Sequence, residues 1–527
     1  MKRLALLVPY LFATACALGP TYHRPKVGSS TTTYQPASAG EDSSRATFDS
    51  LAASRDSMIH LPGDTMKAPP AGEAAGSHTA DYPNLNYKLS DSAANISWFD
   101  LFQDTVLTQL VTTAVNENRD VRVAVATINE YRALLGQSTG SFFPQIDANA
   151  QAGKAKPAFG AGITIPSSSV ALVQGTLNWE LDFWGRLRQT REGARNDLLA
   201  QEDSRRAVVL DLVSTVTAAY LRLRELDLDL EISRNTLRSN QQTLDLARQR
   251  FNRGVISELD VRQFEANVAD PAAQVANYQR QVQQQEDTVA FLLGHYPGPI
   301  PRGRPLNEVL AQVDVPVGVP STLLDRRPDV RQAEHNLVAA TARVGAALDD
   351  RLPKFTISGN WGLEAFDTTH TTFKFPGPGK FDAAGNQTYQ LFLGVSVPIF
   401  HGGALKSAQD AAQARREQAR YLYERTVLDA TREVDGALVE VRTDREQVIA
   451  QQTQVNALRR ALQLANDRYA AGVSSYLDVL NAERSLFTAE VSLTAAERQG
   501  LVGVIALYRA LGGGWPVKGY KLEGAGK

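Results

Sequence analysis

A tandem duplication constrains the fold of this 527-residue chain more than any other feature of its sequence. Residues 246–261 align without a gap with residues 464–479, at an offset of 218 positions. Each stretch predicts a helix, a tight turn and a second helix, because Gly254 and Gly472 suit the left-handed residue that ends a helix. Such a turn must lie at the end of a long hairpin, and both copies must share one order of elements.

The residues that follow each turn predict the start of the return helix. Ser257 and Asp260 have the spacing of a capping box, in which the two side chains bond each other's backbone amides. Ser475 and Asp478 repeat that spacing in the second copy. We therefore expect Ser257, Asp260 and Ser475 to cap helices at the two turns.

The duplication covers most of the chain beyond Trp98. Asn118 aligns with Arg327 at an offset of 209, and the offset becomes 218 after nine extra residues between Pro353 and Val395. Two copies of this length predict one pseudo-symmetric body rather than two functional domains. The predicted division is a first repeat at 98–294, a proline-rich connector at 295–320, a second repeat at 321–512 and a tail at 513–527.

The spacing of apolar residues changes from helical to strand-like within each copy. Segments at about 100–141 and 321–351 are helical and end at a proline, which precedes alternating apolar and polar residues. Uninterrupted helices of 68 residues follow, at 186–253 and 404–471, and each would reach about 100 Å. Pro271 should break and kink one return helix. Four strands of about ten residues are predicted, at about 145–154, 170–183, 354–363 and 389–399.

The four strands allow two interpretations. Strands of this length fit a half-buried sheet in a soluble domain, and they also fit a transmembrane β-barrel, whose strands need about 9–11 residues. Single-chain membrane barrels begin at about eight strands, and open sheet edges are not tolerated in lipid. If these strands cross a membrane, several copies of the chain must therefore share one barrel.

The N-terminus predicts a signal peptide at residues 1–15. Two basic residues precede a mostly apolar run that is too short to span a bilayer. Cys16, the only cysteine, follows directly; it is either an incidental thiol or an acylated residue that anchors the mature chain to a membrane leaflet. Residues 16–97 then form an N-terminal arm with little periodicity, rich in Ser, Thr, Ala, Pro and Gly.

Composition and motifs exclude several function classes. The formal net charge of −2 offers no electrostatic case for binding nucleic acid. The sequence contains no zinc-protease, paired-cysteine, nucleophile-elbow or phosphate-loop motif, and its 7 histidines are scattered singly. We therefore expect no enzyme activity, no cofactor and no bound metal.

Several short motifs resemble one known family. Residues 16–25 contain the Gly-Pro-x-Tyr-x-x-Pro pattern of the mature N-terminus in outer-membrane lipoproteins of RND-type efflux systems. Residues 326–329 (Arg-Arg-Pro-Asp), residues 179–182 (Trp-Glu-Leu-Asp), and the second turn with Tyr469 and Gly472 are similar to that family as well. The chain from Cys16 to about Trp515 thus resembles a TolC-like outer-membrane factor.

This resemblance implies a fold and a set of partners. The fold class would be α+β: duplicated long helical hairpins in a periplasmic α-barrel, and four strands per chain in a homotrimeric, twelve-stranded outer-membrane β-barrel. The two turns would form the periplasmic entrance, where an adaptor (membrane fusion) protein docks around Gly254, Val255, Gly472 and Val473. An RND-type inner-membrane pump, outer-membrane lipid and an acylated Cys16 complete the expected assembly.

The resemblance also assigns roles at the entrance. Tyr469 matches a tyrosine that ties neighbouring helices together in the closed state, and Arg468 matches an arginine with a similar role. Asp478 matches a carboxylate of the entrance ring, whereas Asn481 replaces the second carboxylate of that ring. Two alternatives stay open: Asp478 only caps its helix, as we expect of Asp260, and Tyr469 only packs between helices.

Three function hypotheses follow. The favoured one is a passive exit duct that carries small molecules from an RND-type pump and opens when the second turn moves outward. The second is the duct of a type I exporter of proteins or peptides, driven by an ABC transporter. The third is a soluble coiled-coil scaffold with a small β-domain. The lipoprotein-like N-terminus favours the first.

Overall fold

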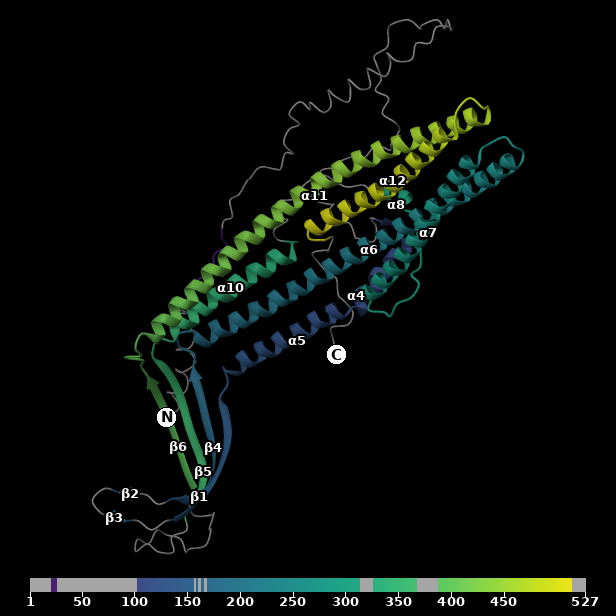
Figure 1. Ribbon diagram of the computed structural model, residues 1–527. Helices are drawn as coiled ribbons and strands as arrows, with labels where there is room; N and C mark the ends of the chain where they lie inside the picture. The colour runs from purple at the N-terminus through teal and green to yellow at the C-terminus, as the bar shows by residue number, and fades with distance from the viewer. Residues whose placement is uncertain are drawn as a thin grey trace, which may run out of the picture.

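The computed structural model describes residues 20–25, 102–155, 158–159, 163–164, 168–312, 326–366 and 387–513. Two hairpins of long helices run side by side, and a four-stranded sheet extends from the end opposite their turns (Figure 1). The predicted signal peptide, most of the N-terminal arm with Cys16, and the tail beyond Gly513 lie outside the described residues. The main elements are α4 (Thr105–Glu117), α5 (Arg119–Gly140), β1 (Gln145–Ala155), β4 (Ser168–Leu181), α6 (Arg186–Asn252) and α7 (Glu258–Leu293) in the first copy, α8 (Leu306–Gln312) in the connector, and α10 (Pro328–Asp349), β5 (Lys354–Phe366), β6 (Gln387–Ser396), α11 (Ala404–Ala470) and α12 (Tyr476–Ala510) in the second.

The first predicted helical segment, 100–141, is two helices rather than one. Asn118 separates α4 from α5: its backbone N–H bonds a carbonyl of α4, and its side-chain Oδ1 accepts from the backbone N–H of Asp120 at 2.8 Å. Asparagine is among the preferred N-terminal caps because its side chain competes for backbone hydrogen bonds. The matching helix of the second copy, α10, begins at Pro328.

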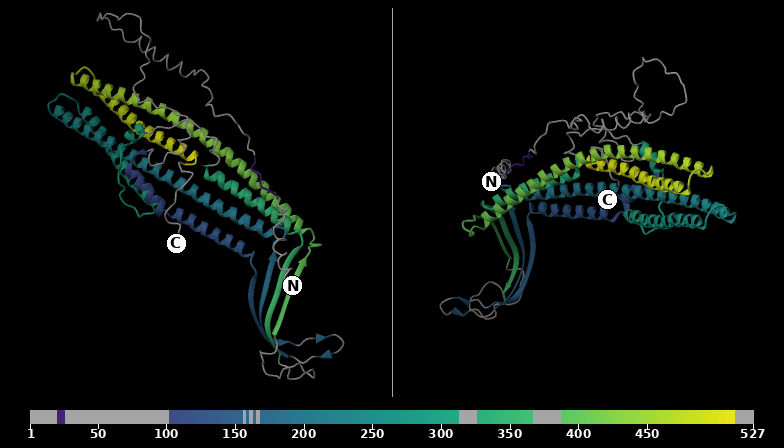
Figure 2. Two further views of the ribbon diagram at one scale, coloured as in Figure 1. Left: turned by 180° about the vertical axis from the view of Figure 1, so that it is seen from behind. Right: turned by 45° about the horizontal axis from the view of Figure 1, so that its top comes forward.

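Helices α6 and α11 are uninterrupted for 67 residues each, so each reaches about 100 Å. Figure 2 shows from two further sides that the α6–α7 and α11–α12 hairpins stay together up to their turns. The predicted break at Pro271 does not occur, since α7 is continuous through it. The proline is buried, and the helix continues through it although the ring removes one backbone hydrogen bond. None of the described helices is both long and apolar enough to cross a membrane.

The sheet joins the two copies. Its strand order is β1-β4-β5-β6, all antiparallel, and β4 of the first copy pairs with β5 of the second, with Trp179 opposite Ile357. A short hairpin of β2 (Ala158–Phe159) and β3 (Ile163–Thr164), which was not predicted, lies between β1 and β4 in the chain. Each repeat thus supplies one antiparallel pair of strands, and the pairing of β4 with β5 joins the two pairs into one sheet.

Two strands end earlier than predicted, whereas β5 extends three residues further, to Phe366. β6 ends at Ser396 rather than near 399, because Pro398 has no N–H to continue the ladder. β4 ends at Leu181 rather than at 183, because the next residue serves the following helix. Asp182 accepts hydrogen bonds from the backbone N–H groups of Leu187 at 2.9 Å and Arg188 at 3.0 Å, at the start of α6.

The sheet is not complete within one chain. The outer edges of β1 and β6 have no partner strand among the described residues. Tyr389, Leu391 and Leu393 of β6 are 82, 72 and 71% exposed. Unpaired edges and exposed apolar side chains are costly in water, so this sheet requires further molecules around it.

The main apolar core lies among the helices, away from the sheet. Tyr220, Leu221 and Leu223 of α6 are buried there with residues of α4, α7 and α8. Leu501 and Ile505 of α12 belong to the same cluster, so the core joins the two copies as well.

Equivalent hydrogen bonds close both repeats. Asn118 Nδ2 donates to the carbonyl of Leu292 at 2.9 Å, and Arg327 Nη1 donates to the carbonyl of Ala510 at 2.8 Å. Asn118 and Arg327 are aligned in the duplication, and so are Leu292 and Ala510. In each copy, the residue before the helix that leads to the sheet (α5 or α10) therefore donates to a carbonyl at the end of the return helix (α7 or α12).

Residues 20–25, shortly after Cys16 in the chain, lie on α10 and α11. The Tyr22 hydroxyl donates to Glu334 Oε1 at 3.1 Å. Arg24 pairs with Glu334 Oε2 at 3.0 Å and donates to the Tyr423 hydroxyl at 3.1 Å. These contacts fix the segment to helices of the second repeat.

Candidate functional site

Both hairpins end in the same backbone turn, at the end of the molecule farthest from the sheet (Figure 1). Gly254 and Gly472 have left-handed backbones, with φ of 74° and 72°. The N–H of Val255 bonds the carbonyl of Arg250 at 2.9 Å, and the N–H of Val473 bonds the carbonyl of Arg468 at 3.0 Å. These bonds satisfy the last carbonyls of α6 and α11 in the same way.

The return helices start differently. In the first turn, Asp260 Oδ2 accepts from the backbone N–H of Ser257 at 2.9 Å, and Ser257 Oγ accepts from the N–H of Asp260 at 3.3 Å, which completes the predicted capping box. In the second turn, Ser475 has the backbone conformation of a cap, but its side chain makes no capping bond. The predicted capping role of the Ser475 side chain is therefore wrong. The exposed Asp478 side chain bonds no described residue.

Of the four residues predicted to form a gate, the structure brings only Tyr469 into contact with the other turn. Arg468, Asp478 and Asn481 are exposed. The guanidinium of Arg250, from the first turn, lies 5.4 Å from the centre of the Tyr469 ring, within range of a cation–π interaction. The Tyr469 ring also lies 5.6 Å from the ring of Tyr476.

Apolar side chains are exposed at matching positions of both turns. Val255 and Val473 are each 69% exposed. Leu259 and Leu477, the second residues of the return helices α7 and α12, are exposed as well. Apolar residues that recur in this way at the ends of two hairpins form a small surface suited to contact with another protein.

Behind the turns, two aligned glutamates have different surroundings. Glu265 of the first copy accepts hydrogen bonds from Arg248 and Arg262, which lower the pKa of its carboxyl group. Glu483 of the second copy lacks a cationic neighbour of this kind, and burial raises its pKa. Its Oε2 is buried without a hydrogen-bond partner.

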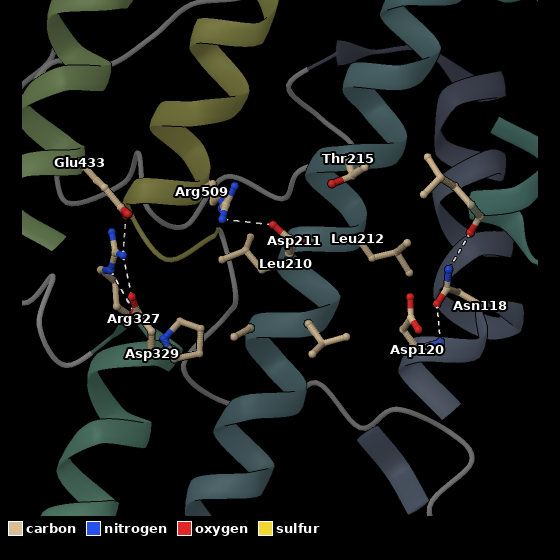
Figure 3. Close-up of a pocket in the computed structure, with 14 residues that line it drawn as sticks. Asn118, Asp120, Leu210, Asp211, Leu212, Thr215, Arg327, Asp329, Glu433 and Arg509 are labelled. Atoms are coloured by element: carbon tan, nitrogen blue, oxygen red, sulfur yellow. Dashed lines mark hydrogen bonds and ion pairs between the residues drawn. The ribbon is translucent and has the colours of Figure 1, made fainter. Parts of the chain in front are cut away.

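The Arg-Arg-Pro-Asp motif at the start of α10 lies beside a surface cavity of about 610 Å³ (Figure 3). Arg327 is 5% exposed, and its Nη2 lies 2.7 Å from oxygens of both Asp329 and Glu433. Arg509 pairs with Asp211 at 3.1 Å beside the same cavity. The motif therefore ties α10 to α11 and α12, and its buried arginine is fully engaged in that structural role. No group of three or more metal-binding side chains occurs within the described part of the chain.

Comparison with known proteins decides the family. A family model described as "Outer membrane efflux protein" matches residues 110–295 and 319–513. The chain belongs to the outer membrane efflux protein family. As a member of this family it is an outer-membrane channel protein with a periplasmic helical tunnel, and not an enzyme.

Relatives of this efflux protein match most of its length. It is 32% identical over 428 residues to the toluene efflux pump outer membrane protein TtgC of Pseudomonas putida, in a match that covers 80% of this chain and 86% of the relative. It is 31% identical over 427 residues to the cation efflux system protein CusC of Escherichia coli (81% and 90%). The crystal structure of the open state of the Neisseria gonorrhoeae MtrE outer membrane channel matches with a TM-score of 0.74 at 27% identity, covering 95% of this chain and 98% of that one.

Three residues that link the turns of this efflux protein were missed in the sequence. Arg250 and Phe264 of the first hairpin and Tyr476 of the second lie around the contact between the turns. One signal was available: Tyr476 is an aromatic residue at a position where the first copy has the charged Glu258. A difference of this size between aligned repeats indicates different surroundings.

Proposed function

We propose that this efflux protein is the passive exit duct of a tripartite system that carries small molecules from an RND-type inner-membrane pump. The observation that carries the proposal is the combination of two unfinished surfaces in one chain. A sheet with two open edges lies at one end, and two helical turns with exposed apolar residues lie at the other. The sheet requires further copies of the chain in a membrane, and the turns require a partner protein. A soluble scaffold explains neither surface.

The sheet supports a homotrimer. Four strands are fewer than the eight or so with which single-chain membrane barrels begin, and open edges are not tolerated in lipid. Three copies, with β6 of one chain beside β1 of the next, make a closed barrel of twelve strands. The exposed apolar side chains of β6 then face lipid.

The turns are the proposed docking points for a periplasmic adaptor protein. Gly254 with Val255, and Gly472 with Val473, present the same backbone turn twice per chain. Three chains would present six such turns, so one adaptor surface can bind at each of them with the same contacts.

The second turn is the proposed gate of the periplasmic entrance. Arg468 and Tyr469 hold it closed, Asp478 supplies a ring of negative charge, and Asn481 leaves the next ring neutral. Support comes from the exposure of Asp478 and Asn481 and from the absence of a described partner for the Asp478 carboxylate. A free carboxylate near a narrow pore attracts cations.

The N-terminus is the proposed lipid anchor. Cleavage after residue 15 would leave Cys16 as the acylated first residue of the mature chain. Tyr22 and Arg24, bound to α10 and α11, would hold the start of the arm against the helices. The proposed division of the chain is otherwise the one predicted above: repeats at 98–294 and 321–512, joined by the connector.

Cross-linking at the turns tests the proposal. A photoreactive amino acid at position 473 should capture a periplasmic adaptor in cells, and the complex should also contain an RND-type pump. The same probe at Leu428, an exposed apolar residue far from the turns on α11, serves as the control and should not capture the adaptor. Capture of an ABC transporter complex would instead support a type I exporter, and extraction without detergent would support a soluble scaffold.

A further inference from the structure

The contact between α6 and α12 changes in character along its length. Near the main core, Arg498 pairs with Glu225 at 2.7 Å, and the Thr494 hydroxyl donates to Asp229 Oδ1 at 2.6 Å. These two pairs lie four residues apart on both helices and therefore mark one antiparallel register. Continued toward the turns, this register places Tyr476 of α12 opposite Ala247 of α6.

At that position, Tyr476 occupies an apolar slot of the first hairpin. Its ring centre lies 3.8 Å from that of Phe264 on α7, and the two rings are inclined by 37°. The slot is lined by four buried side chains of the first hairpin: Leu244, Ala247, Val261 and Phe264. Tyr476 is thus a residue of the second copy packed into the first copy.

The contacts of Tyr476 continue into the gate. Its ring lies 5.6 Å from that of Tyr469, which in turn lies under the guanidinium of Arg250. The order is therefore Phe264, Tyr476, Tyr469, Arg250, with the first hairpin at both ends and the second turn in the middle. Any outward movement of the second turn must separate Tyr476 from Phe264, Tyr469 from Arg250, or both.

The polar groups beside the slot are incompletely satisfied. Asn240 Nδ2 donates to the carbonyl of Asn267 at 2.9 Å. Asn240 Oδ1 and Glu483 Oε2 are buried without hydrogen-bond partners. Buried polar groups without partners destabilise the packing around them, which makes this contact easier to release than the Arg498–Glu225 ion pair and the Thr494–Asp229 hydrogen bond nearer the core.

Only the second copy places a side chain in the other hairpin at this position. The residue of the first copy aligned with Tyr476 is Glu258, which is exposed and pairs with Arg262 at 3.2 Å. Ala482, the residue of the second copy aligned with Phe264, lacks an aromatic ring. After the duplication, the two copies therefore differ at both positions: the first hairpin has the slot, and the second has the side chain that fills it.

We propose that Tyr476 is a positioning residue of the gate, which holds the second turn against the first hairpin of the same chain and leaves its slot when the channel opens. This inference rests on the proposed function, because it assumes that the turns close a channel. The contact of Tyr476 with Phe264 would act together with Arg468 and Tyr469, and it lies behind them, between the return helices α12 and α7.

Single-channel recording tests the inference. Purified protein is reconstituted in planar lipid bilayers, and the fraction of time in the open state is measured for Tyr476→Ala, Tyr476→Phe and Glu258→Ala. Tyr476→Ala should raise the open fraction at least about tenfold, because it removes an aromatic pair from every chain. Tyr476→Phe keeps the ring and should stay as closed as the wild type. Glu258→Ala, at the aligned exposed position, should also stay closed.

A second variant tests the same contact by replacing the aromatic pair with a covalent link. Phe264→Cys with Tyr476→Cys contains only one other cysteine, Cys16. A short cleavable thiol cross-linker should hold this channel closed, and cleavage should release it. The inference is overturned if Tyr476→Ala conducts like the wild type, or if the cross-linked channel opens freely.

The recordings separate failure of the inference from failure of the proposed function. If the wild-type protein forms no conducting channel, both fail. If Arg468→Ala opens the channel and Tyr476→Ala does not, the gate stands and the role of Tyr476 is refuted. Thermal unfolding of Tyr476→Ala at the wild-type midpoint shows that the contact, rather than general stability, is being measured.

Discussion

The two turns share a backbone but differ in what their side chains do. Both are closed by a left-handed glycine and by a bond from the following valine to an arginine carbonyl. In the first turn, the polar side chains bond partners within the same hairpin. Ser257 and Asp260 form a capping box, and Glu265 forms ion pairs with Arg248 and Arg262. The first turn is thus self-contained.

The second turn lacks these local bonds. The side chain of Ser475 makes no cap, and the exposed Asp478 bonds no described residue. The Oε2 atom of Glu483 is buried without a hydrogen-bond partner. The aromatic residues of the second turn instead contact the first hairpin. In the proposed gate, the first copy is therefore the fixed support and the second copy is the part that moves.

The largest expected effect comes from locking each turn in place. Asn481→Cys should form disulfides between neighbouring chains of the proposed trimer and abolish export under oxidising conditions, because the proposed gate opens by outward movement of the second turn. The matched control is Gln263→Cys, the aligned position of the first copy. Export is measured as the minimal inhibitory concentration of a pumped compound, with and without reductant. Full export through an oxidised, cross-linked Asn481→Cys channel would remove the distinction between the turns.

A smaller effect is expected from the two aligned glutamates. Burial raises the pKa of Glu483 above its ordinary value of 4.5. The folded protein then binds more protons than the unfolded chain, so stability should fall as pH rises from about 4.5 to the raised pKa, and stay level above it. Glu483→Gln should remove this dependence and raise the thermal unfolding midpoint by a few degrees at neutral pH.

Glu265→Gln is the control for this pH dependence, because the contribution of Glu265 to stability changes with pH in the opposite direction. Hydrogen bonds from Arg248 and Arg262 lower the pKa of Glu265, so its contribution to stability is present above about pH 4.5 and is lost as pH falls through the lowered pKa. The substitution should leave neutral-pH stability unchanged or slightly lower. A shared pH profile for the two variants would mean that Glu483 is solvated in the assembled protein.

Local patterns in the sequence predicted the long helices and the four main strands, but neither the division of 100–141 into α4 and α5 nor the contacts between elements. Glycine position, strand alternation and uninterrupted helical runs predicted the two turns, the four strands and the long helices. The Ser-x-x-Asp spacing occurs twice, yet only Ser257 forms the box, because spacing sets which groups can meet and the surrounding packing sets whether they do. The contact of Tyr476 with Phe264 spans 212 residues of sequence, and periodicity within one helix carries no information about it.

The smallest effect should distinguish the aligned aspartates. Asp260→Ala removes a capping side chain and should cost about 1 kcal/mol of local stability at the start of α7. Asp478→Ala removes a side chain that bonds no described residue and should leave the start of α12 as stable as before. Hydrogen exchange of the backbone amides at 258–262 and 476–480 measures both. If Asp478 serves the entrance, its substitution should instead raise the concentration of a multivalent cation needed to block single channels, whereas Asp260→Ala should not. Loss of protection at 476–480 with unchanged cation block would assign Asp478 to capping alone.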